Sequence, residues 1–213
     1  MPSDSVPAVG ARIREERLRR GFSLRALARE VGVSASMVSQ IETGRSRPSV
    51  STLYAITSAL GISIEDVFDA AVPAAPSARS ARVAVGGQPT TVLEALASSP
   101  GPRLGPLVQP SERQVLVLDS GVTWERLGAL PPHATDFLRI TYAPGGTSSS
   151  TGELMRHSGA EYGLLQSGEL VLTLGFEEIH LTPGDSVSFE SSTPHRYRND
   201  GTEPAVGIWF VTG

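Results

Sequence analysis

The sequence of 213 residues contains no cysteine and no lysine. The lack of cysteine excludes disulfide bonds, cysteine-bound zinc, iron–sulfur clusters and thiol nucleophiles. No apolar run approaches the length of about 18 residues that crosses a bilayer. The first ten residues also lack the basic and apolar regions of a secretory signal. We therefore expect a soluble cytoplasmic protein that has no membrane partner.

Positively and negatively charged residues are distributed unevenly along the chain. Residues 11–47 carry nine arginines against four glutamates, a net charge of +5, whereas residues 73–213 carry nine arginines against fourteen acids, a net charge of −5. A basic N-terminal part on an acidic body predicts that one end of the molecule contacts a polyanion and the other does not.

The composition divides the chain into three segments. Apolar residues recur at helical spacing in residues 8–70, and short apolar runs separated by glycine and proline fill residues 111–213. Between them, residues 71–110 begin with a run rich in alanine, proline and serine, which is typical of a linker. We expect residues 92–97 to form a short helix within this otherwise irregular segment.

The helical segment contains a pair of helices joined by a tight turn. Leu24, Leu27, Ala28 and Val31 share one helix face, and Gly32 supplies the residue that tolerates a positive φ. Ser34 is a candidate N-cap for the second helix, whose inner residues are Val38 and Ile41. Three further helices are expected, at about residues 9–20, where Ile13 and Leu18 would face inward, 50–60 and 63–68. Five short helices predict a compact all-α domain.

The run SLRALAREVGVSASMVSQIETGRSRPSVSTL, residues 23–53, closely resembles the helix-turn-helix of the phage-repressor-like XRE family. The resemblance implies that the second helix of the motif enters the major groove of DNA. It further implies that Ala35, Ser36 and Ser39 read bases, whereas the residues that hold phosphates are Arg25, Gln40, Arg45 and Arg47. It also implies an ion pair between Arg17 and Glu42. The alternative is a helical bundle with a solvated arginine face that does not bind DNA.

The C-terminal segment shows the spacing of an all-β sandwich or barrel. Short strand candidates alternate with turn residues such as Pro183-Gly184-Asp185. The expected strands are residues 114–118, 137–142, 162–166, 169–174, 178–181, 186–189 and 206–211.

Two stretches of this segment, RHSGAEYGLLQSGEL and LTPGDSVSFESSTPHRYRN, resemble the two motifs of the cupin barrel, a double-stranded β-helix or jelly roll. The resemblance implies that His157, Glu161 and His195 converge on one divalent metal ion: iron, manganese, nickel or zinc. Met155 stands where the first motif usually has a further histidine. A vacant pocket in which the same three side chains form hydrogen bonds is the alternative. Met155 and Tyr197 are the candidate contacts for a small molecule, and His133 and His180 are expected at the surface or in loops.

Along nearly its whole length the chain resembles XRE–cupin transcriptional regulators. This implies a homodimer that presents two recognition helices to a pseudo-palindromic operator, a cupin domain that senses a small-molecule effector, and no catalytic residue. A second hypothesis is a mononuclear non-haem iron oxygenase similar to hydroxypropylphosphonate epoxidase. The lack of lysine and the arginine-rich N-terminal part favour the regulator. A third, a sugar isomerase or other simple cupin enzyme, leaves the helical part unexplained.

Overall fold

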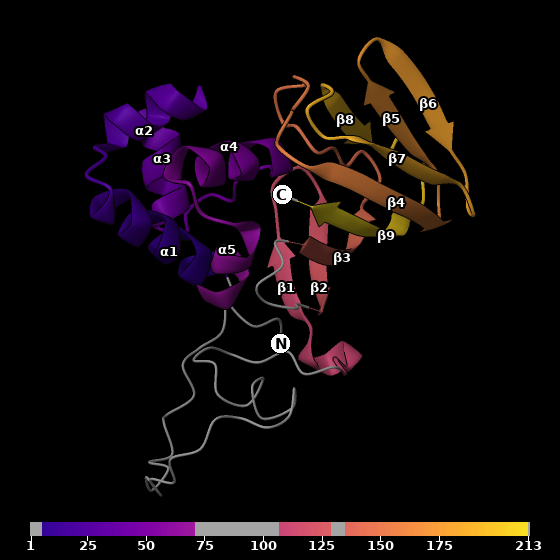
Figure 1. Cartoon of the computed structure of the whole chain (residues 1–213), viewed down its shortest axis with the longest axis horizontal. Coiled ribbons are helices and arrows are strands. Elements are labelled where there is room, and N and C mark those ends of the chain that lie inside the picture. Colours follow the sequence, from indigo (N-terminus) through magenta and orange to yellow (C-terminus); the bar gives the residue numbers. More distant parts are fainter. Residues whose placement is uncertain (1–5, 71–106, 129–134, 213) are drawn as a thin grey trace, which may run out of the picture.

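The computed structural model describes residues 6–70, 107–128 and 135–212. The N-terminal part is a bundle of short helices that lies beside a β-domain (Figure 1). This arrangement, an all-α N-terminal domain followed by an all-β jelly roll, confirms the fold class that the sequence predicts. The helices are α1 (Val6–Arg19), α2 (Leu24–Val31), α3 (Ala35–Glu42), α4 (Val50–Leu60) and α5 (Ile64–Ala70).

Serine side chains begin the three central helices of the bundle. The hydroxyl oxygens of Ser23, Ser34 and Ser49 each accept a hydrogen bond from the backbone N–H three residues ahead, at 3.1 to 3.2 Å. Gly32 ends α2 in the left-handed conformation, with a φ of 77°. Its turn brings α2 and α3 together as a helix-turn-helix, as the spacing predicts.

The inner face of α1 differs from the prediction at one residue. Ile13 is fully buried, but Leu18 is 58% exposed. The buried positions of α1 follow the spacing of Val9, Ile13 and Arg17, so Arg17 takes the place next to the core and Leu18 is turned outward. The expectation that Leu18 faces the core was therefore wrong.

The β-domain is a pair of antiparallel sheets. One contains six strands in the order β1-β2-β3-β9-β4-β7, and the other three in the order β6-β5-β8. The strands are β1 (Gln114–Val117), β2 (Val122–Gly128), β3 (Thr135–Tyr142), β4 (Ala160–Ser167), β5 (Leu170–Leu174), β6 (Glu177–Leu181), β7 (Ser186–Glu190), β8 (His195–Arg198) and β9 (Ala205–Thr212). A short 3-10 helix, η1 (Pro110–Glu112), precedes β1.

Two strands, β2 and β8, are absent from the sequence prediction. In β8, whose sequence is HRYR, the inward residues are His195 and Tyr197, so its buried face carries no aliphatic residue. Strand β2 alternates buried Val122 and Trp124 with polar residues, a short period-2 pattern that its charged residues obscure.

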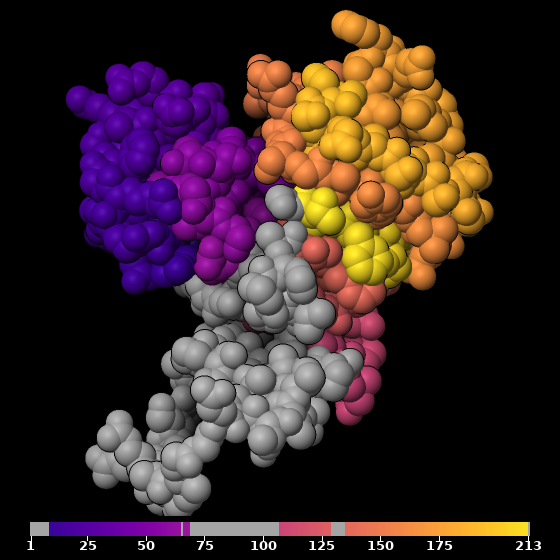
Figure 2. Space-filling view, viewed as in Figure 1, coloured from indigo at the N-terminus to yellow at the C-terminus, as the bar shows by residue number. Residues whose placement is uncertain are grey.

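The two domains share one buried apolar core, which includes residues of α4, α5 and both sheets. The space-filling view shows the helical lobe against the β-lobe (Figure 2). The Gln114 side-chain amide donates to the carbonyl oxygen of Phe68 at 3.4 Å, and the guanidinium of Arg126 lies 5.8 Å from the centre of the Phe68 ring. α5 is therefore held on the first strands of the β-domain.

Several expectations concern residues outside the described ranges. The helix at residues 92–97, most of the linker and His133 are among them. The division at residues 8–70, 71–110 and 111–213 thus stays a prediction. Within the described ranges, every helix falls short of the length and apolarity needed to cross a bilayer.

Candidate DNA interface and metal centre

The helix α3 presents small polar residues to solvent. Val38 and Ile41 are buried, which fixes the opposite face outward. On that outward face Ser36 and Gln40 are exposed and Ser39 is half-buried, whereas Ala35 is half-buried and packs against the core. The structure therefore places three of the four predicted residues of α3, Ser36, Ser39 and Gln40, on one accessible surface, which we call the recognition surface.

Arginines surround the recognition surface. Arg25 is exposed in the first turn of α2, and Arg45 and Arg47 are exposed in the loop that follows α3. The Arg45 backbone N–H donates to the carbonyl oxygen of Gln40 at 2.8 Å, which folds this loop back onto the end of α3. Met37, also exposed on α3, is a further candidate that the sequence analysis missed.

The predicted ion pair between Arg17 and Glu42 is present and buried. The Arg17 guanidinium contacts the carboxylate through two bonds, Nε to Oε1 at 2.5 Å and a second nitrogen to Oε2 at 2.9 Å. A third guanidinium nitrogen donates to the carbonyl oxygen of Phe22 at 2.8 Å. This pair ties α1 to the end of α3 and so fixes the orientation of the recognition surface.

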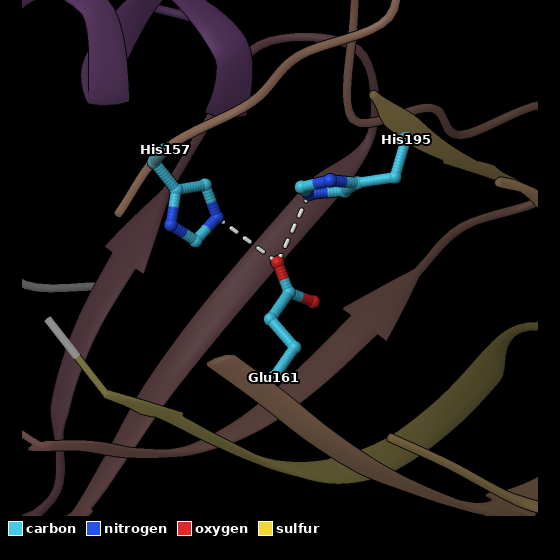
Figure 3. A group of neighbouring side chains, drawn as sticks. All are labelled: His157, Glu161 and His195. Carbon is cyan, nitrogen blue, oxygen red and sulfur yellow. Dashed lines mark hydrogen bonds and ion pairs between the residues drawn. The ribbon is translucent and has the colours of Figure 1, made fainter. Parts of the chain in front are cut away.

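The second candidate site lies at the end of the β-domain that faces the helices. Glu161 is on β4 of the large sheet, His195 begins β8 of the small sheet, and His157 lies in the loop before β4. Their side chains are at most 5% exposed. Figure 3 shows both imidazoles aimed at one carboxylate oxygen, with the Nε2 of each 3.0 Å from Glu161 Oε1. We call these three residues the triad.

The hydrogen bonds of the imidazoles determine which nitrogen carries the proton. His157 Nδ1 lies 3.0 Å from the carbonyl oxygen of Ser158, and His195 Nδ1 lies 2.8 Å from that of Thr193. Because a carbonyl oxygen only accepts, each Nδ1 carries a hydrogen. Each Nε2 then turns either a lone pair or a second proton toward the carboxylate. His195 Nε2 is buried and forms no hydrogen bond among the described residues, although it lies 3.0 Å from Glu161 Oε1.

This donor set fits a divalent cation. Two imidazole Nε2 atoms and one carboxylate oxygen within 4.8 Å of one another make the two-histidine, one-carboxylate pattern of many transition-metal sites. The backbone acceptors of both Nδ1–H groups are the outer contacts that such ligands usually have. A divalent cation between the three side chains would accept the lone pair of each Nε2, including that of His195, which has no hydrogen-bond partner among the described residues.

Further side chains orient the carboxylate. Tyr197 donates its hydroxyl hydrogen to Glu161 Oε2 at 3.2 Å, and Trp209 Nε1–H donates to the Tyr197 oxygen at 3.2 Å. Burial acts to raise the pKa of Glu161, but the two histidines lower it by more, to about 2. Glu161 is therefore a carboxylate with Oε1 directed to the histidines.

The predicted small-molecule contacts are buried. Met155 is paired with His195 by two backbone hydrogen bonds of 2.8 and 2.9 Å, and both Met155 and Tyr197 line a narrow internal cavity of about 10 Å³. His180 is exposed on β6, as expected. The sequence analysis missed one neighbour of the triad, Tyr54 of α4, whose ring lies against His157.

Comparison with known proteins identifies both domains. The helix-turn-helix family model matches residues 13–67, and the cupin domain model matches residues 138–211. The HTH-type transcriptional regulator PuuR of Escherichia coli is 28% identical over 92% of this chain and 90% of its own length. The regulator SutR of the same species is 26% identical over 90% of this chain and 86% of its own.

A solved structure shows the same fold. The crystal structure of an HTH_3 family transcriptional regulator from Vibrio cholerae superposes with a TM-score of 0.59 and 23% identity, covering 97% of this chain and 96% of the other. The chain therefore carries a helix-turn-helix region and a C-terminal cupin domain, and over about nine tenths of its length it is similar to HTH-type transcriptional regulators.

Proposed function

We infer that the protein is a transcriptional regulator that binds double-stranded DNA through the recognition surface of α3 and acts in the cytoplasm, where bacterial DNA lies. The observation that carries this proposal is one exposed surface of small polar side chains with three exposed arginines around it. Short polar side chains can approach base edges, and arginines hold the phosphates on either side. Selection from a pool of random duplexes tests it, because a specific regulator enriches one sequence and a general polyanion binder enriches none.

A homodimer would supply the two recognition helices that a pseudo-palindromic operator needs. The outer face of the large sheet supports this proposal, since Tyr162, Leu164 and Phe210 are each more than 40% exposed there. Phe137 stacks on Phe210 at 4.3 Å, and Phe210 is the cross-strand neighbour of Tyr162. An exposed apolar patch of this kind is typical of a protein interface, and we assign it to a second copy of the chain.

Charge placed in this patch should produce monomers. We expect Tyr162→Glu combined with Phe210→Glu to halve the mass measured by analytical ultracentrifugation, because each glutamate would be buried in the dimer without a partner. Phe176→Glu is the control, because Phe176 is fully exposed between β5 and β6, away from the patch. A dimeric double variant would show that the copies meet elsewhere.

We further propose that the triad holds one divalent transition-metal ion through His157 Nε2, Glu161 Oε1 and His195 Nε2. Three protein ligands leave coordination positions open, so the ion would supply a Lewis-acid anchor for an oxygen or nitrogen atom of an effector. The chain's own residues determine the geometry. Tyr197 and Trp209 hold the carboxylate, and two backbone carbonyl groups hold the imidazoles.

Loss of one imidazole should abolish stoichiometric metal. We expect His157→Ala to contain less than about a tenth of the metal of the unmodified protein by elemental analysis, since a two-ligand site binds weakly. His180→Ala is the matched control, because His180 is an exposed histidine outside the triad. Metal retained by His157→Ala would show that the ligands are other residues.

We propose that the cupin domain is a sensor and that the protein is not an enzyme. The internal cavity beside Glu161 measures about 10 Å³, barely the space for one water molecule. Because an effector meets the same limit as a substrate, this cavity does not separate the two functions, and the arginines around the recognition surface are what favour a regulator. The triad itself would also suit the alternative, a non-haem iron oxygenase. Specific DNA binding is the property that distinguishes a regulator from that enzyme.

A further inference from the structure

Tyr54 brings the DNA-binding domain into direct contact with the triad. It lies on α4, and its ring stacks on the His157 imidazole with the ring centres 4.1 Å apart and the planes 1° apart. The same ring meets Trp124 of β2 edge to face, at 5.9 Å and 64°. Tyr54 is thus held between a ligand of the proposed metal ion and the wall of the barrel.

The position of Tyr54 depends on how α4 docks. The Ser51 backbone N–H donates to the carbonyl oxygen of Ser148 at 3.0 Å, and the Asp119 N–H donates to that of Pro48 at 2.9 Å. Val50 and Tyr54 both line the internal cavity of the barrel. The N-terminal half of α4 therefore closes the open end of the barrel, and a helical domain that undocks takes Tyr54 away from His157.

The space around the triad lies at the junction of the two domains. A cavity of about 130 Å³ is lined by Tyr54, Asp136 and His157, and a larger one of about 470 Å³ by Tyr54, Met155 and Arg156, among others. Tyr54 borders both cavities as well as the interior of the barrel. His157 lines only the smaller cavity, and a molecule that reaches His157 from there meets the tyrosine ring.

We propose that Tyr54 is a positioning residue for His157 and that it couples occupation of the triad to docking of the helix-turn-helix domain. His157 is the one triad residue that lies in a loop, so its imidazole depends most on outside contacts for its orientation. A parallel ring at 4.1 Å restricts rotation of the imidazole and keeps Nε2 aimed at the site.

Coupling of this kind is reciprocal. If docking of α4 strengthens metal binding by some factor, bound metal strengthens docking by the same factor. The state of the cupin site would then alter how firmly each recognition helix is held relative to the barrel. This inference rests on the metal site proposed above, but it assigns a role to a residue outside that site.

Titration of the metal-free full-length protein with Co²⁺, followed by its visible absorption, tests the first half of the proposal. We expect Tyr54→Phe, which keeps the ring, to bind Co²⁺ within about twofold of the unmodified protein. Tyr54→Leu and Tyr54→Ala should bind about tenfold more weakly, the low end of the loss seen when an outer contact of a ligand is removed. Ser58→Ala is the matched control, since Ser58 lines the same two cavities.

Hydrogen exchange of the Ser51 amide tests the second half, because its bond to Ser148 exists only while α4 is docked. Saturating Co²⁺ should slow this exchange about tenfold in the unmodified protein and leave it unchanged in Tyr54→Leu. If Tyr54 only stabilised the docked helix, Tyr54→Leu would change the exchange rate of the Ser51 amide by the same factor with and without Co²⁺.

The outcomes separate the two proposals. Equal Co²⁺ affinity in the unmodified protein, Tyr54→Leu and Tyr54→Ala would overturn the role of Tyr54 and leave the metal site intact. No binding of Co²⁺ by the unmodified protein would overturn the metal site and this inference together. Neither result would affect the proposal of DNA binding, which is measured separately.

Discussion

Replacing Arg17 by alanine is expected to destabilise the helical domain by about 3–5 kcal/mol, because Glu42 would stay buried as an unpaired charge. Both side chains of the pair are less than 10% exposed, and the arginine also holds the carbonyl oxygen of Phe22. The free energy of unfolding from urea titration, followed by helical circular dichroism, measures the effect. DNA affinity should fall with it, since the pair connects α1 to the end of α3.

Two further variants show whether the pair itself is responsible. The double variant Arg17→Met, Glu42→Leu should recover most of the lost stability, because it removes both charges and keeps their volume. Arg12→Ala breaks ion pairs with Glu15 and Glu16 on the same helix and is expected to cost less than about 1 kcal/mol. A loss below about 1 kcal/mol in Arg17→Ala would contradict the assignment of a buried pair.

The recognition surface predicts two kinds of variant with different effects on DNA binding. We expect Ser36→Tyr and Ser39→Tyr to change which sequence a random duplex pool enriches, because each places a bulky ring where, in the proposed complex, a small hydroxyl group would face the bases. Alanine at both Arg45 and Arg47 should instead weaken binding to all sequences and reduce the salt slope by about 2, about one phosphate contact for each arginine.

The serine variants and the double arginine variant serve as controls for each other, because one kind should change the sequence preference and the other the salt dependence. A serine variant that keeps the original sequence preference would remove that position from the base-reading surface. A double arginine variant that shifts the preference without a change in salt slope would show that the arginines read bases and do not hold phosphates. Folding of each variant is checked by its thermal unfolding.

The helical domain could be predicted nearly in full because its signals are local. Serine caps, the apolar positions three and four residues apart and the glycine turn all lie within about thirty residues of one another. Leu18 was placed wrongly because it was assigned to the core by its apolar character alone, whereas the buried spacing of Val9 and Ile13 continues to Arg17, whose ion pair the resemblance had implied.

The triad could be predicted from motif spacing, whereas its surroundings could not. His157 and Glu161 lie four residues apart in the first cupin-like motif, and His195 lies in the second. The resemblance to cupins therefore implies that the three side chains converge on one site. The stack of Tyr54 on His157 joins residues more than a hundred positions apart in different domains. No local pattern encodes that contact, since it depends on how α4 docks on the barrel. Strand β8 was missed because its inward residues are a histidine and a tyrosine, so it lacks the aliphatic residues by which a short strand is usually predicted.

The most direct test of a DNA-binding regulator is fluorescence anisotropy of the purified protein against labelled DNA from upstream of its own gene, at several salt concentrations. Our account predicts tight binding that persists in excess competitor DNA and weakens with salt in proportion to the phosphates held. Binding that competitor DNA removes completely, with and without Co²⁺, would contradict the account and favour the iron oxygenase.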